Sequence, residues 1–584
     1  MIVVAVLLVV AARAATIGLF GVFHVDLPAQ FANVSLAANP FDPAQLSVRA
    51  SASDGQTVGG FVYQHYVRSH ANGGEKLTPT DAPHVAVRFV AKQLGLLCVT
   101  GVHVTLNNAS NTFAMSTCVT VVASSKRGFV RVAANRQHFV FDGTDDAFVP
   151  VGENMCWSTS ANLTYDYDQW VSDLGAVGGN YFRLWLNPPG LSPFALESVA
   201  TGVGRYDLEA AWRLDYVLQL AVQNEFDFRV MLATQTFNCF STTIFPTWNS
   251  NPYNAKNGGP LATPFEFFSD PTAQSLYKRS LRFLIDRFSS YTSVFAWEFF
   301  NEVDLVDGFD GNIVSQWHKE MASFVAANDP YDHLRTTSFA FPGGLNATWQ
   351  IREISYTQTH SYNAADMIAM DVIFNPGMVS RFDKPTLMGE FGTSNNGATE
   401  YQQDPTGIAL FNGMWAGLVT SAGSGFLWWW DDYVAAYPYL YERFVGVSAM
   451  ARTLSPFVAR YYWTFQEITV APVRLLMSSG VALNSSSGHP VLMGLFANTN
   501  FTWNAYGRGV PTNPVGSQPN VRLQMPAAEP GSYKALFFNT TDGQPLQNVA
   551  TGPIIVGVGG LASIAVPPTL TTSLFVIAVK TEKK

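Results

Sequence analysis

The chain has 584 residues, of which 48% are apolar and only 13% are charged, and its formal net charge is −9. This length allows two to four domains, and an acidic balance without a Lys/Arg cluster argues against nucleic acid or an anionic membrane as the partner. The 14 tryptophans suit a protein that stacks flat, uncharged ligands such as sugar rings, although a hydrophobic core would use them equally well.

The N-terminus predicts a secretory signal over residues 1–15. Ile2 to Ala12 is an apolar run too short to span a membrane, and Ala12-Arg13-Ala14 offers a cleavage site, although a basic region before the run is missing. No later segment is long and apolar enough for a membrane span. We therefore expect a secreted protein without a membrane span.

Two further features fit export. N-x-S/T sequons occur at Asn33, Asn108, Asn162, Asn346, Asn484, Asn500 and Asn539. The four cysteines make an even set, as is usual in an oxidising compartment. Cys98 and Cys118 flank a turn-rich stretch and could bridge neighbouring strands, whereas Cys156 and Cys239 lie near the ends of two expected strands of the central region. Their spacing does not indicate a metal site, and the sequence leaves the pairing open.

Residues 16–125 predict an N-terminal β-sandwich domain. The region carries short alternating runs such as QLSVRASA and HVAVRFVA, broken by Gly, Pro, Asn and Asp, and it contains no convincing helical window. A polar stretch over residues 124–128 is expected to link this domain to the next one.

Residues 128–465 alternate strand-like runs with helical windows, which is typical of parallel βα units. The expected strands are 148–155, 181–186, 228–234, 294–302, 334–339, 356–362, 385–392 and 425–433, with helical windows at 208–224, 273–291, 313–328 and 407–421. Eight such repeats predict an α/β fold, the (β/α)8 TIM barrel. The alternative, a doubly wound open sheet, would carry a Gly-rich phosphate turn after its first strand, and this chain has GENMCW there.

Residues 466–584 return to short strands such as VRLLMSS, VLMGLFAN and SLFVIAV. These runs predict a second small β-sandwich packed on the barrel. The expected architecture is therefore a TIM barrel flanked by N-terminal and C-terminal β-sandwich domains.

A barrel of this kind places its active site at the C-terminal ends of the strands. The residues with useful chemistry at these ends are Arg183 and Trp185 on the second expected strand, Asn301 and Glu302 on the fourth, His360 and Tyr362 on the sixth, Glu390 on the seventh, and Trp428 to Trp430 on the eighth. This set meets the needs of a retaining glycosidase, which breaks a glycosidic bond with two carboxyl groups about 5 Å apart.

The two glutamates would take different roles in that mechanism. Glu390 would be the ionised nucleophile, with Arg183 close enough to lower its pKa and Tyr362 able to donate a hydrogen bond to it. Glu302 would act first as acid and then as base, so its pKa is expected to be raised by apolar neighbours and by the charge of Glu390. Asn301 is placed to hydrogen-bond a sugar 2-hydroxyl.

Each residue also has a plainer interpretation. A strand-end glutamate is often part of a salt bridge or a helix cap, but two of them at the expected ends of strands four and seven favour catalysis. Arg183 would serve equally in a buried ion pair. His360, which we expect to orient or tune the acid/base, and Tyr362 would otherwise be core residues. Glu153, after the first strand, is interpreted as structural.

The aromatic side chains Trp157, Trp185, Trp428 and Trp430 are expected to bind sugar rings, with core packing as the alternative. Because successive side chains of a strand point to opposite faces, only one parity of residues 428–430 can face the barrel mouth. We favour Trp428 and Trp430.

Three motifs carry a resemblance to a known family. Residues 297–302, WEFFNE, look like the strand-four W-E-x-x-N-E motif of clan A glycoside hydrolases, and residues 387–392, LMGEFG, are similar to their strand-seven nucleophile motif. His360 and Tyr362 match the usual strand-six pair. Together these motifs resemble the family 5 glycoside hydrolases, the cellulase and mannanase family, over residues 128–465.

The N-terminal region resembles the β-sandwich that precedes the barrel in some members of that family. The matching segments are residues 39–42, 60–63, 128–131 and 150–154. The resemblance implies that Glu302 is the acid/base, that Glu390 is the nucleophile, and that Arg183, Asn301, His360 and Tyr362 line the catalytic subsite. One departure affects substrate preference: many members place a histidine near the end of strand three, and here Gln235 or Asn238 stands in its place.

The sequence thus predicts a secreted retaining glycosidase that acts on a β-linked polymer or oligosaccharide, most simply a β-1,4-glucan or a β-mannan. We expect no cofactor and no metal, because the two carboxyl groups supply acid, base and nucleophile. The alternatives are another clan A activity, such as β-galactosidase, xylanase or glucosylceramidase-like hydrolysis, and a carbohydrate-binding protein of the cell surface with an inactive barrel.

Overall fold

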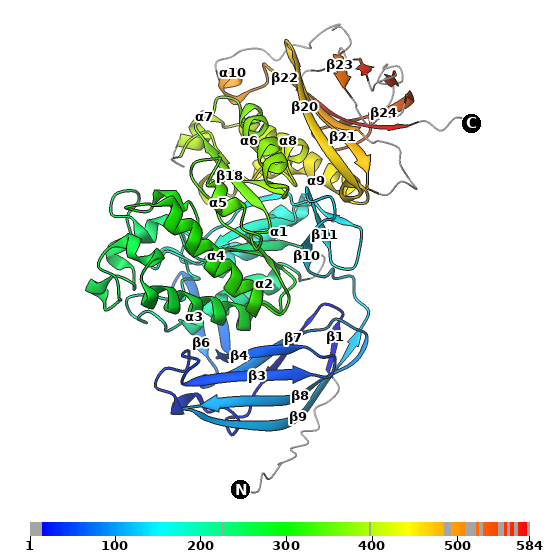
Figure 1. Cartoon of the computed structure of the whole chain (residues 1–584). Helices are drawn as coiled ribbons and strands as arrows, with labels where there is room; N and C mark the ends of the chain where they lie inside the picture. The colour runs from blue at the N-terminus through cyan, green and yellow to red at the C-terminus, as the bar shows by residue number, and fades with distance from the viewer. Residues whose placement is uncertain are drawn as a thin grey trace.

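The computed structural model describes residues 15–223, 226–395, 399–483, 492–507, 521–524, 530–546, 554–557, 561–565, 570 and 572–580. The expected signal segment, apart from Ala15, and the sequon at Asn484 lie outside these residues. An N-terminal β part, a central α/β part and a C-terminal β part follow one another through the molecule in chain order (Figure 1).

The N-terminal part is built on one sheet of seven strands. Its strands are β1 (Ala15–Gly18), β2 (Val22–Asp26), β3 (Leu46–Ala52), β4 (Thr57–Tyr63), β7 (His84–Val90), β8 (Gly95–Leu106) and β9 (Ala109–Val122), in the order β1-β9-β8-β3-β4-β7-β2. A separate hairpin joins β5 (Tyr66–Ala71) and β6 (Gly74–Pro79). Alternate residues such as Val48, Val87 and Val102 bury one face in a common apolar cluster. Strand pairing joins all seven strands in one sheet, so the two-sheet sandwich stays a prediction.

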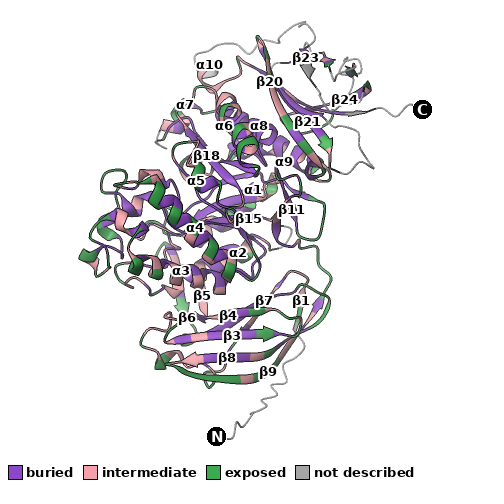
Figure 2. Ribbon diagram, viewed as in Figure 1, coloured by how far each residue is buried: buried purple, intermediate pink, exposed green. Residues whose placement is uncertain are grey.

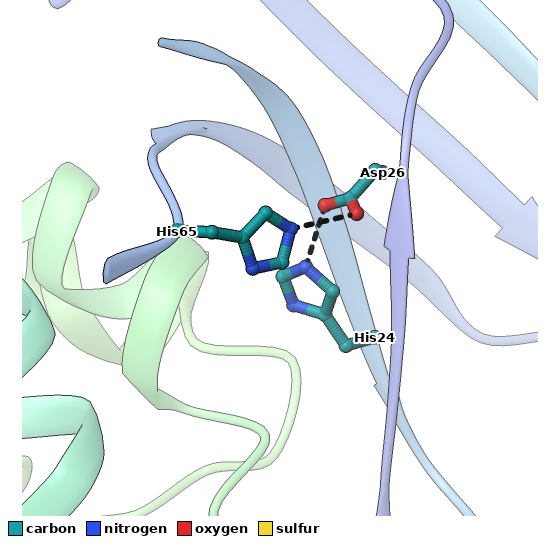
Figure 3. A group of neighbouring side chains, drawn as sticks. All are labelled: His24, Asp26 and His65. Atoms are coloured by element: carbon teal, nitrogen blue, oxygen red, sulfur yellow. Dashed lines mark hydrogen bonds and ion pairs between the residues drawn. The ribbon is translucent and has the colours of Figure 1, made fainter. Parts of the chain in front are cut away.

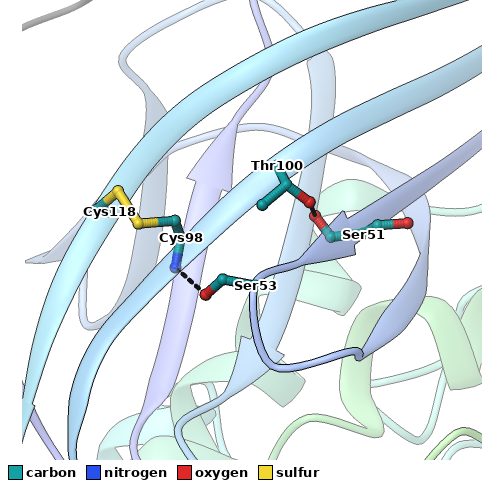
Figure 4. Close-up of a disulfide and its surroundings, with 5 residues drawn as sticks. All are labelled: Ser51, Ser53, Cys98, Thr100 and Cys118. Atoms are coloured by element: carbon teal, nitrogen blue, oxygen red, sulfur yellow. Dashed lines mark hydrogen bonds between the residues drawn. A yellow bond between two sulfur atoms is a disulfide. The ribbon is translucent and has the colours of Figure 1, made fainter.

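Cys98 and Cys118 form a disulfide between β8 and β9, where the two residues face each other in the strand register (Figure 4). The expectation that these cysteines bridge neighbouring strands is confirmed. The Cys98 N–H also donates to Ser53 Oγ at 3.0 Å, which ties the bridged hairpin to the turn after β3. Cys156 and Cys239 are buried free thiols and do not form a second bridge.

The central part is a ring of parallel strands. β13 (Gly152–Asn154), β14 (Tyr181–Trp185), β15 (Arg229–Ala233), β16 (Val294–Glu298) and β17 (Leu334–Thr336) pair in this order, and β18 (Thr357–Tyr362) pairs with β19 (Thr386–Gly392). Leu427 bridges to Glu153 of β13 and to Phe391 of β19, which closes the ring on that side. Between β17 and β18, the Ser355 N–H donates to Arg335 O at 2.7 Å. This order is that of the predicted (β/α)8 barrel.

The eighth expected strand, residues 425–433, is wrong in extent. Only Leu427 makes bridges there, and residues Trp430–Val434 form a π-helical turn. The reason is that the backbone bonds locally: the Val434 N–H donates to Trp429 O at 3.3 Å and the Ala435 N–H to Trp430 O at 2.7 Å, which closes a turn and takes these carbonyls out of the barrel sheet.

The bottom of the barrel is closed by a small antiparallel sheet of β10 (Val130–Val132), β11 (Phe139–Phe141) and β12 (Ala147–Phe148). Phe139 packs against Phe295 and Tyr356, with ring centroids 5.1 and 5.5 Å apart. Pro150, which has no N–H to donate, lies between β12 and β13, so the expected strand 148–155 is divided in two. This apolar plug leaves the opposite end of the barrel for polar side chains.

The helices surround the strands. They are α1 (Thr164–Ala176), α2 (Leu208–Leu220), α3 (Pro271–Phe288), α4 (Gly311–Asn328), α5 (Asn346–Trp349), α6 (Met367–Phe382), α7 (Glu400–Gln403), α8 (Ile408–Thr420) and α9 (Glu442–Leu454). Asp207, Asp270 and Asp310 cap α2, α3 and α4 by accepting backbone N–H groups of the first turn. The four predicted helical windows match α2, α3, α4 and α8 to within a few residues.

Helix α8 is buried along its whole length, as its sequence IALFNGMWAGLVT suggests (Figure 2). One side packs on the barrel and the other on the C-terminal sheet. Trp415 contacts Phe575 with ring centroids 5.5 Å apart, and Ser478 Oγ donates to Val419 O at 3.1 Å.

The C-terminal part is one eight-stranded sheet with the order β20-β21-β22-β27-β24-β25-β26-β23. Its strands are β20 (Tyr461–Val470), β21 (Val473–Ala482), β22 (Leu492–Asn498), β23 (Val521–Gln524), β24 (Gly531–Asn539), β25 (Ile554–Val556), β26 (Leu561–Ile564) and β27 (Ser573–Lys580), with α10 (Trp503–Gly507) after β22. As in the N-terminal part, the strands predicted by alternation are present, and the sandwich arrangement stays a prediction.

A buried ion cluster joins the N-terminal part to the barrel. Arg88 of β7 donates to Asp215 of α2 through Nη2 at 3.0 Å, and Arg287 of α3 donates to the same carboxylate at 2.8 Å. All three side chains are buried, so the charges satisfy one another.

The surface features linked to export are accessible where they are described. The six described sequon asparagines are all exposed or half-buried. Among the residues described here, no helix has both the length and the apolar character needed to cross a bilayer.

Candidate active site

Four barrel strands bring the predicted site residues to one end of the ring. Arg183 and Trp185 lie on β14, Asn301 and Glu302 follow β16, His360 and Tyr362 end β18, and Glu390 lies on β19. Asn301, His360 and Glu390 are only 1–2% exposed, whereas Glu302 is 9% exposed. The Glu302 carboxyl is therefore the one of the two nearer to solvent.

The backbone holds Glu302 in an unusual conformation. Its φ of 48° and ψ of 52° lie in the left-handed region, which side chains rarely adopt and which costs about 1–3 kcal/mol. The preceding Asn301 N–H donates to Gln235 O at 2.9 Å. The N–H groups of Glu302 and Val303 donate to Ser338 at 3.1 and 3.2 Å. Bonds to the two neighbouring strands thus fix the position of this carboxyl group.

A bulge between β18 and β19 positions Glu390. The register shifts between Thr359 and His360, so that Gly389 has no partner on β18 and His360 stands opposite Glu390. A Cβ on Gly389 would lie 2.4 Å from Gln358 Oε1 and 3.1 Å from His360 Nε2. A side chain here would force the Gln358 amide to move and would crowd the His360 ring, so glycine leaves room for both beside Glu390.

The two carboxyl groups meet across His360. One oxygen of Glu302, one oxygen of Glu390 and one ring nitrogen of His360 all lie within 4.8 Å of one another. His360 Nδ1 is 3.0 Å from Glu302 Oε1 and 3.5 Å from Glu390 Oε2. Retaining glycosidases hold their carboxyls about 5–5.5 Å apart, and inverting ones about 6.5–9.5 Å apart to admit a water. The separation here fits the retaining class.

Arg183 is fully buried and links the site together. Its Nη1 donates to Glu390 Oε1, its Nε and Nη2 donate to Glu298 at 2.7 and 2.8 Å, and its Nη2 also donates to Asn301 Oδ1 at 2.7 Å. The Tyr362 hydroxyl donates to Glu390 Oε2 at 2.5 Å. Each oxygen of Glu390 therefore accepts a hydrogen bond that favours the ionised form. Arg183 is therefore part of a buried ion pair with Glu298 and also contacts Glu390 in the candidate site.

Burial raises the pKa of both glutamates, but the neighbouring charges differ. Burial raises the pKa of Glu302 to about 8, and the nearby charge of Asp304 adds to the rise. Burial also raises the pKa of Glu390, whereas His360 and Arg183 oppose that rise. The sequence correctly predicted a raised pKa for Glu302. The negative charge that adds to the rise is that of Asp304, and not that of Glu390 as expected. For Glu390 the expected effect of Arg183 is present and is outweighed by burial.

The nitrogen of the Asn301 side-chain amide is available to donate hydrogen bonds. Its Oδ1 accepts from Arg183 Nη2 at 2.7 Å and from Ser338 Oγ at 3.2 Å, which sets the orientation of the group. Its Nδ2 is buried and has no hydrogen-bond partner among the described residues. A buried donor without a partner is costly, so a ligand hydroxyl that accepted from it would bind favourably.

The four tryptophans expected at the mouth form one cluster. Ring centroids are 4.9 Å apart for Trp185 and Trp428, 5.0 Å for Trp157 and Trp430, and 5.2 Å for Trp157 and Trp185. Trp429 directs its indole N–H to Ser394 O in the loop after β19. Trp157 and Trp428 are half-buried, whereas Trp185 and Trp430 are only 3–4% exposed, so the first pair is the more accessible.

Three cavities lie outside the candidate site. Cavities of about 550, 380 and 320 Å³ are found between the barrel and the flanking sheets, and the site residues line none of the three.

Sequence reasoning missed the side chains that hold Arg183. Glu298 ends β16 and accepts from Arg183 with both oxygens, and also from Gln358 Nε2 at 3.1 Å. Asn154 of β13 accepts from Arg183 at 3.3 Å and donates to Gly389 O at 3.1 Å. A signal was present, because Glu298 is a carboxylate inside an otherwise apolar strand and such a charge needs a buried partner.

Of the two residues that stand in place of the strand-three histidine, only one adjoins the site. Asn238 uses its side chain within its own loop, accepting from Thr236 Oγ1 at 2.9 Å and donating to Phe245 O at 3.2 Å. Gln235 is 6% exposed and is joined through its backbone to Asn301. Gln235 is therefore the better candidate for a ligand contact on this strand.

Comparisons with known proteins agree with the motifs. No protein-family model matches the chain. The chain is 24% identical over 315 residues to mannan endo-1,4-beta-mannosidase 5 of Solanum lycopersicum, a match that covers 47% of this chain and 72% of that enzyme. It is 24% identical over 307 residues to mannan endo-1,4-beta-mannosidase A of Aspergillus aculeatus, with 47% and 78% covered. A solved endo-beta-1,4-mannanase from Thermotoga petrophila aligns with a TM-score of 0.38 and 14% identity over 73% of this chain and 92% of that one.

The resemblance inferred from the strand-four and strand-seven motifs is thus confirmed by the sequence comparison. The curated relatives are glycoside hydrolases, enzymes that hydrolyse O-glycosyl bonds. By its sequence, this chain resembles the mannan endo-1,4-beta-mannosidases of glycoside hydrolase family 5.

Proposed function

We propose that this protein is a secreted, retaining glycoside hydrolase that cleaves β-1,4-mannan within the polymer chain. The observation that carries the proposal is the meeting of Glu302 and Glu390, with carboxylate oxygens within 4.8 Å of each other. The names of the curated relatives support mannan as the substrate. The disulfide and the accessible sequons support secretion.

The proposed reaction is a double displacement. The Glu390 carboxylate attacks the anomeric carbon while Glu302 gives its proton to the leaving oxygen, and the glycosidic bond breaks. Glu302, now ionised, takes a proton from water, which attacks the glycosyl–Glu390 ester and releases the sugar. Arg183 and Tyr362 hold Glu390 in place, and Asn301 Nδ2 is available for the 2-hydroxyl.

We also propose the domain limits 16–125, 128–465 and 466–584 after a signal over 1–15. The flanking domains are proposed to be β-sandwiches with a structural role. The buried cluster of Arg88, Asp215 and Arg287 and the buried helix α8 support this role, because both attach a flanking sheet firmly to the barrel.

Hydrolysis of a defined β-manno-oligosaccharide should release a product whose new reducing end is the β anomer. The reason is that two successive inversions at one carbon restore its configuration. Proton NMR during the first minutes, before mutarotation, measures the anomer. An α anomer formed first would exclude Glu390 as nucleophile, and a panel with β-1,4-glucan and xylan would show whether mannan is preferred.

The rate should also depend on pH in a bell-shaped way. We expect kcat/KM to fall above about pH 8, because the protonated fraction of Glu302 falls as the pH rises through its pKa. It should fall at acid pH because Glu390 must be ionised. Replacing Asp304 by asparagine removes a negative charge and should move the basic limb down by about one pH unit.

The asparagine at position 304 can still accept a hydrogen bond. Asp304 accepts the N–H groups of Ala340 and Phe341 at 2.7 and 2.9 Å, and an amide oxygen can keep one of these. Initial rates at low substrate over a pH series, for the parent and the variant, measure the shift. A basic limb at the same pH in both proteins would contradict the assignment of that limb to Glu302.

A further inference from the structure

A cavity of about 320 Å³ lies between the barrel and the C-terminal sheet, away from the catalytic glutamates. Its walls come from the turn between β10 and β11 at the bottom of the barrel, from the C-terminal ends of α6 and α8, and from β20 to β22. Ser478 and Met493 are buried at 2% and 1% exposure, whereas Tyr462 is 43% exposed. The cavity is therefore a recess that opens to solvent, and its volume is near the lower end of the range of about 300–1,000 Å³ that is usual for ligand pockets.

The lining of this cavity is uncharged and partly aromatic. None of the described residues that line it is an aspartate, glutamate, lysine or arginine. Such a wall disfavours phosphates, carboxylates and metal ions, because a charge buried without a partner is costly. The rings of Tyr462 and Phe465 are exposed or half-buried, and Ser380 and Thr464 add accessible hydroxyl groups. Aromatic faces with a few hydrogen-bonding groups suit a neutral ligand rich in hydroxyls, such as a sugar.

His138 supplies a buried donor to the cavity. Asn135 Oδ1 accepts the N–H groups of Gln137 and His138 at 3.0 and 3.1 Å, so the amide nitrogen is the atom that lies 3.0 Å from His138 Nδ1. An amide nitrogen only donates, so Nδ1 accepts and Nε2 carries the proton of the neutral ring. Burial lowers the pKa of His138 to about 3, which keeps the ring neutral.

The Nε2–H group of His138 has no hydrogen-bond partner among the described residues, although the side chain is only 4% exposed. The nitrogen is not sealed within the protein, and His138 lines the cavity. A buried donor without a partner is costly, so a hydroxyl that entered the cavity and accepted from it would bind favourably.

We propose that this cavity is a second, non-catalytic carbohydrate site, in which a neutral sugar packs on Tyr462 and accepts a hydrogen bond from His138 Nε2. The preference for a neutral sugar follows from the lining, whereas its identity as a unit of β-mannan rests on the proposed function. A polymer held here stays close to the enzyme, which raises its effective concentration at the barrel mouth. The site therefore favours hydrolysis of long chains over short ones.

The test is a calorimetric titration of β-1,4-mannotriose into the full chain carrying Glu390→Gln, a change that is expected to stop hydrolysis. We expect two binding events, one at the barrel mouth and one in the cavity. Tyr462→Ala should weaken one event by about 10-fold or more and leave the other unchanged, because it removes an aromatic ring from the cavity alone. His138→Phe keeps a ring but not the donor, and it should weaken the same event by about 3–10-fold.

His65→Ala is the matched control. His65 and His24 direct their rings at the Asp26 carboxylate on the N-terminal domain (Figure 3), so the His65 imidazole already has a partner, unlike that of His138. The His65 side chain is accessible and lies far from the cavity in the chain and in the fold, and both binding events should keep their affinities in this variant.

Two events that keep their affinities in Tyr462→Ala would overturn the proposal, as would a single event that this variant leaves intact, or no binding at all. A single event that Tyr462→Ala weakens would support the cavity and count against the barrel mouth, so a failure of the proposed function is distinguishable. Because Tyr462 is 43% exposed, its truncation removes little core packing, and circular dichroism shows whether the fold persists.

Discussion

Replacement of Glu390 by glutamine is expected to lower kcat on β-mannan by about 10⁴-fold or more, with KM within a few-fold of the parent. A neutral amide cannot form the glycosyl ester, while the neighbouring Arg183, Tyr362 and tryptophans still bind the sugar. The side chain keeps its shape, so the loss is one of chemistry and not of folding. Initial rates of reducing-end release, with the protein shown to be folded by circular dichroism, measure the effect.

Glu153→Gln is the matched control for Glu390→Gln. Glu153 is also a fully buried barrel glutamate, and burial raises its pKa well above the usual value, which favours its neutral form. Glutamine closely resembles a protonated glutamate, and activity should stay within a few-fold of the parent. If Glu390→Gln kept a tenth or more of the parent kcat, Glu390 would not be the nucleophile.

Azide separates the roles of the two glutamates. In Glu302→Ala the glycosyl ester still forms, and azide in place of water should give a β-glycosyl azide. In Glu390→Ala azide attacks from the face that the missing carboxylate occupied, and a substrate with a good leaving group should give the α product. The same anomer from both variants would contradict the assigned roles.

Replacement of Arg183 by methionine should damage both activity and stability. Glu298 would be left fully buried without its cation, which costs about 3–5 kcal/mol. Glu390 would lose the donor on Oε1 and Asn301 the donor that orients its amide, so kcat/KM should fall by about 10³-fold. Urea unfolding followed by tryptophan fluorescence and steady-state kinetics measure the two effects.

A double variant distinguishes the structural from the functional part of this loss. Arg183→Met with Glu298→Leu removes both buried charges, so it should regain much of the stability but none of the activity. Arg352→Met, which removes a 93% exposed arginine paired with Glu353, is the control and should change neither. Near-normal kinetics in Arg183→Met would show that Glu390 does not depend on this guanidinium.

Much of the barrel could be predicted from local sequence. Strands β14, β15 and β19 are short apolar runs, and the structure has each within one residue of its expected limits. Helices α2, α3 and α4 follow aspartate caps that the chain itself supplies. Because parallel strands expose their C-terminal ends at one mouth, the candidates Glu302 and Glu390 followed from strand order alone.

Other features depended on partners far away in the chain. Residues 428–430 have the sequence pattern of a strand, but only Leu427 pairs with the barrel strands. The indole N–H groups of Trp429 and Trp430 donate to backbone carbonyls of other loops. The role of Glu298 depends on its ion pair with Arg183. The raised pKa of Glu302 depends partly on Asp304, whose carboxylate accepts a backbone N–H from Ala340, after β17.

By itself the sequence determined which segments are strands and helices and which residues end them, because periodicity, caps and turns depend on neighbouring residues. Only the tertiary structure decided which ends touch: the bulge that sets His360 opposite Glu390, the network around Arg183, and the cluster around Asp26. Such contacts join strands separated by many residues, and their geometry depends on packing to within a fraction of an ångström, which no local pattern encodes.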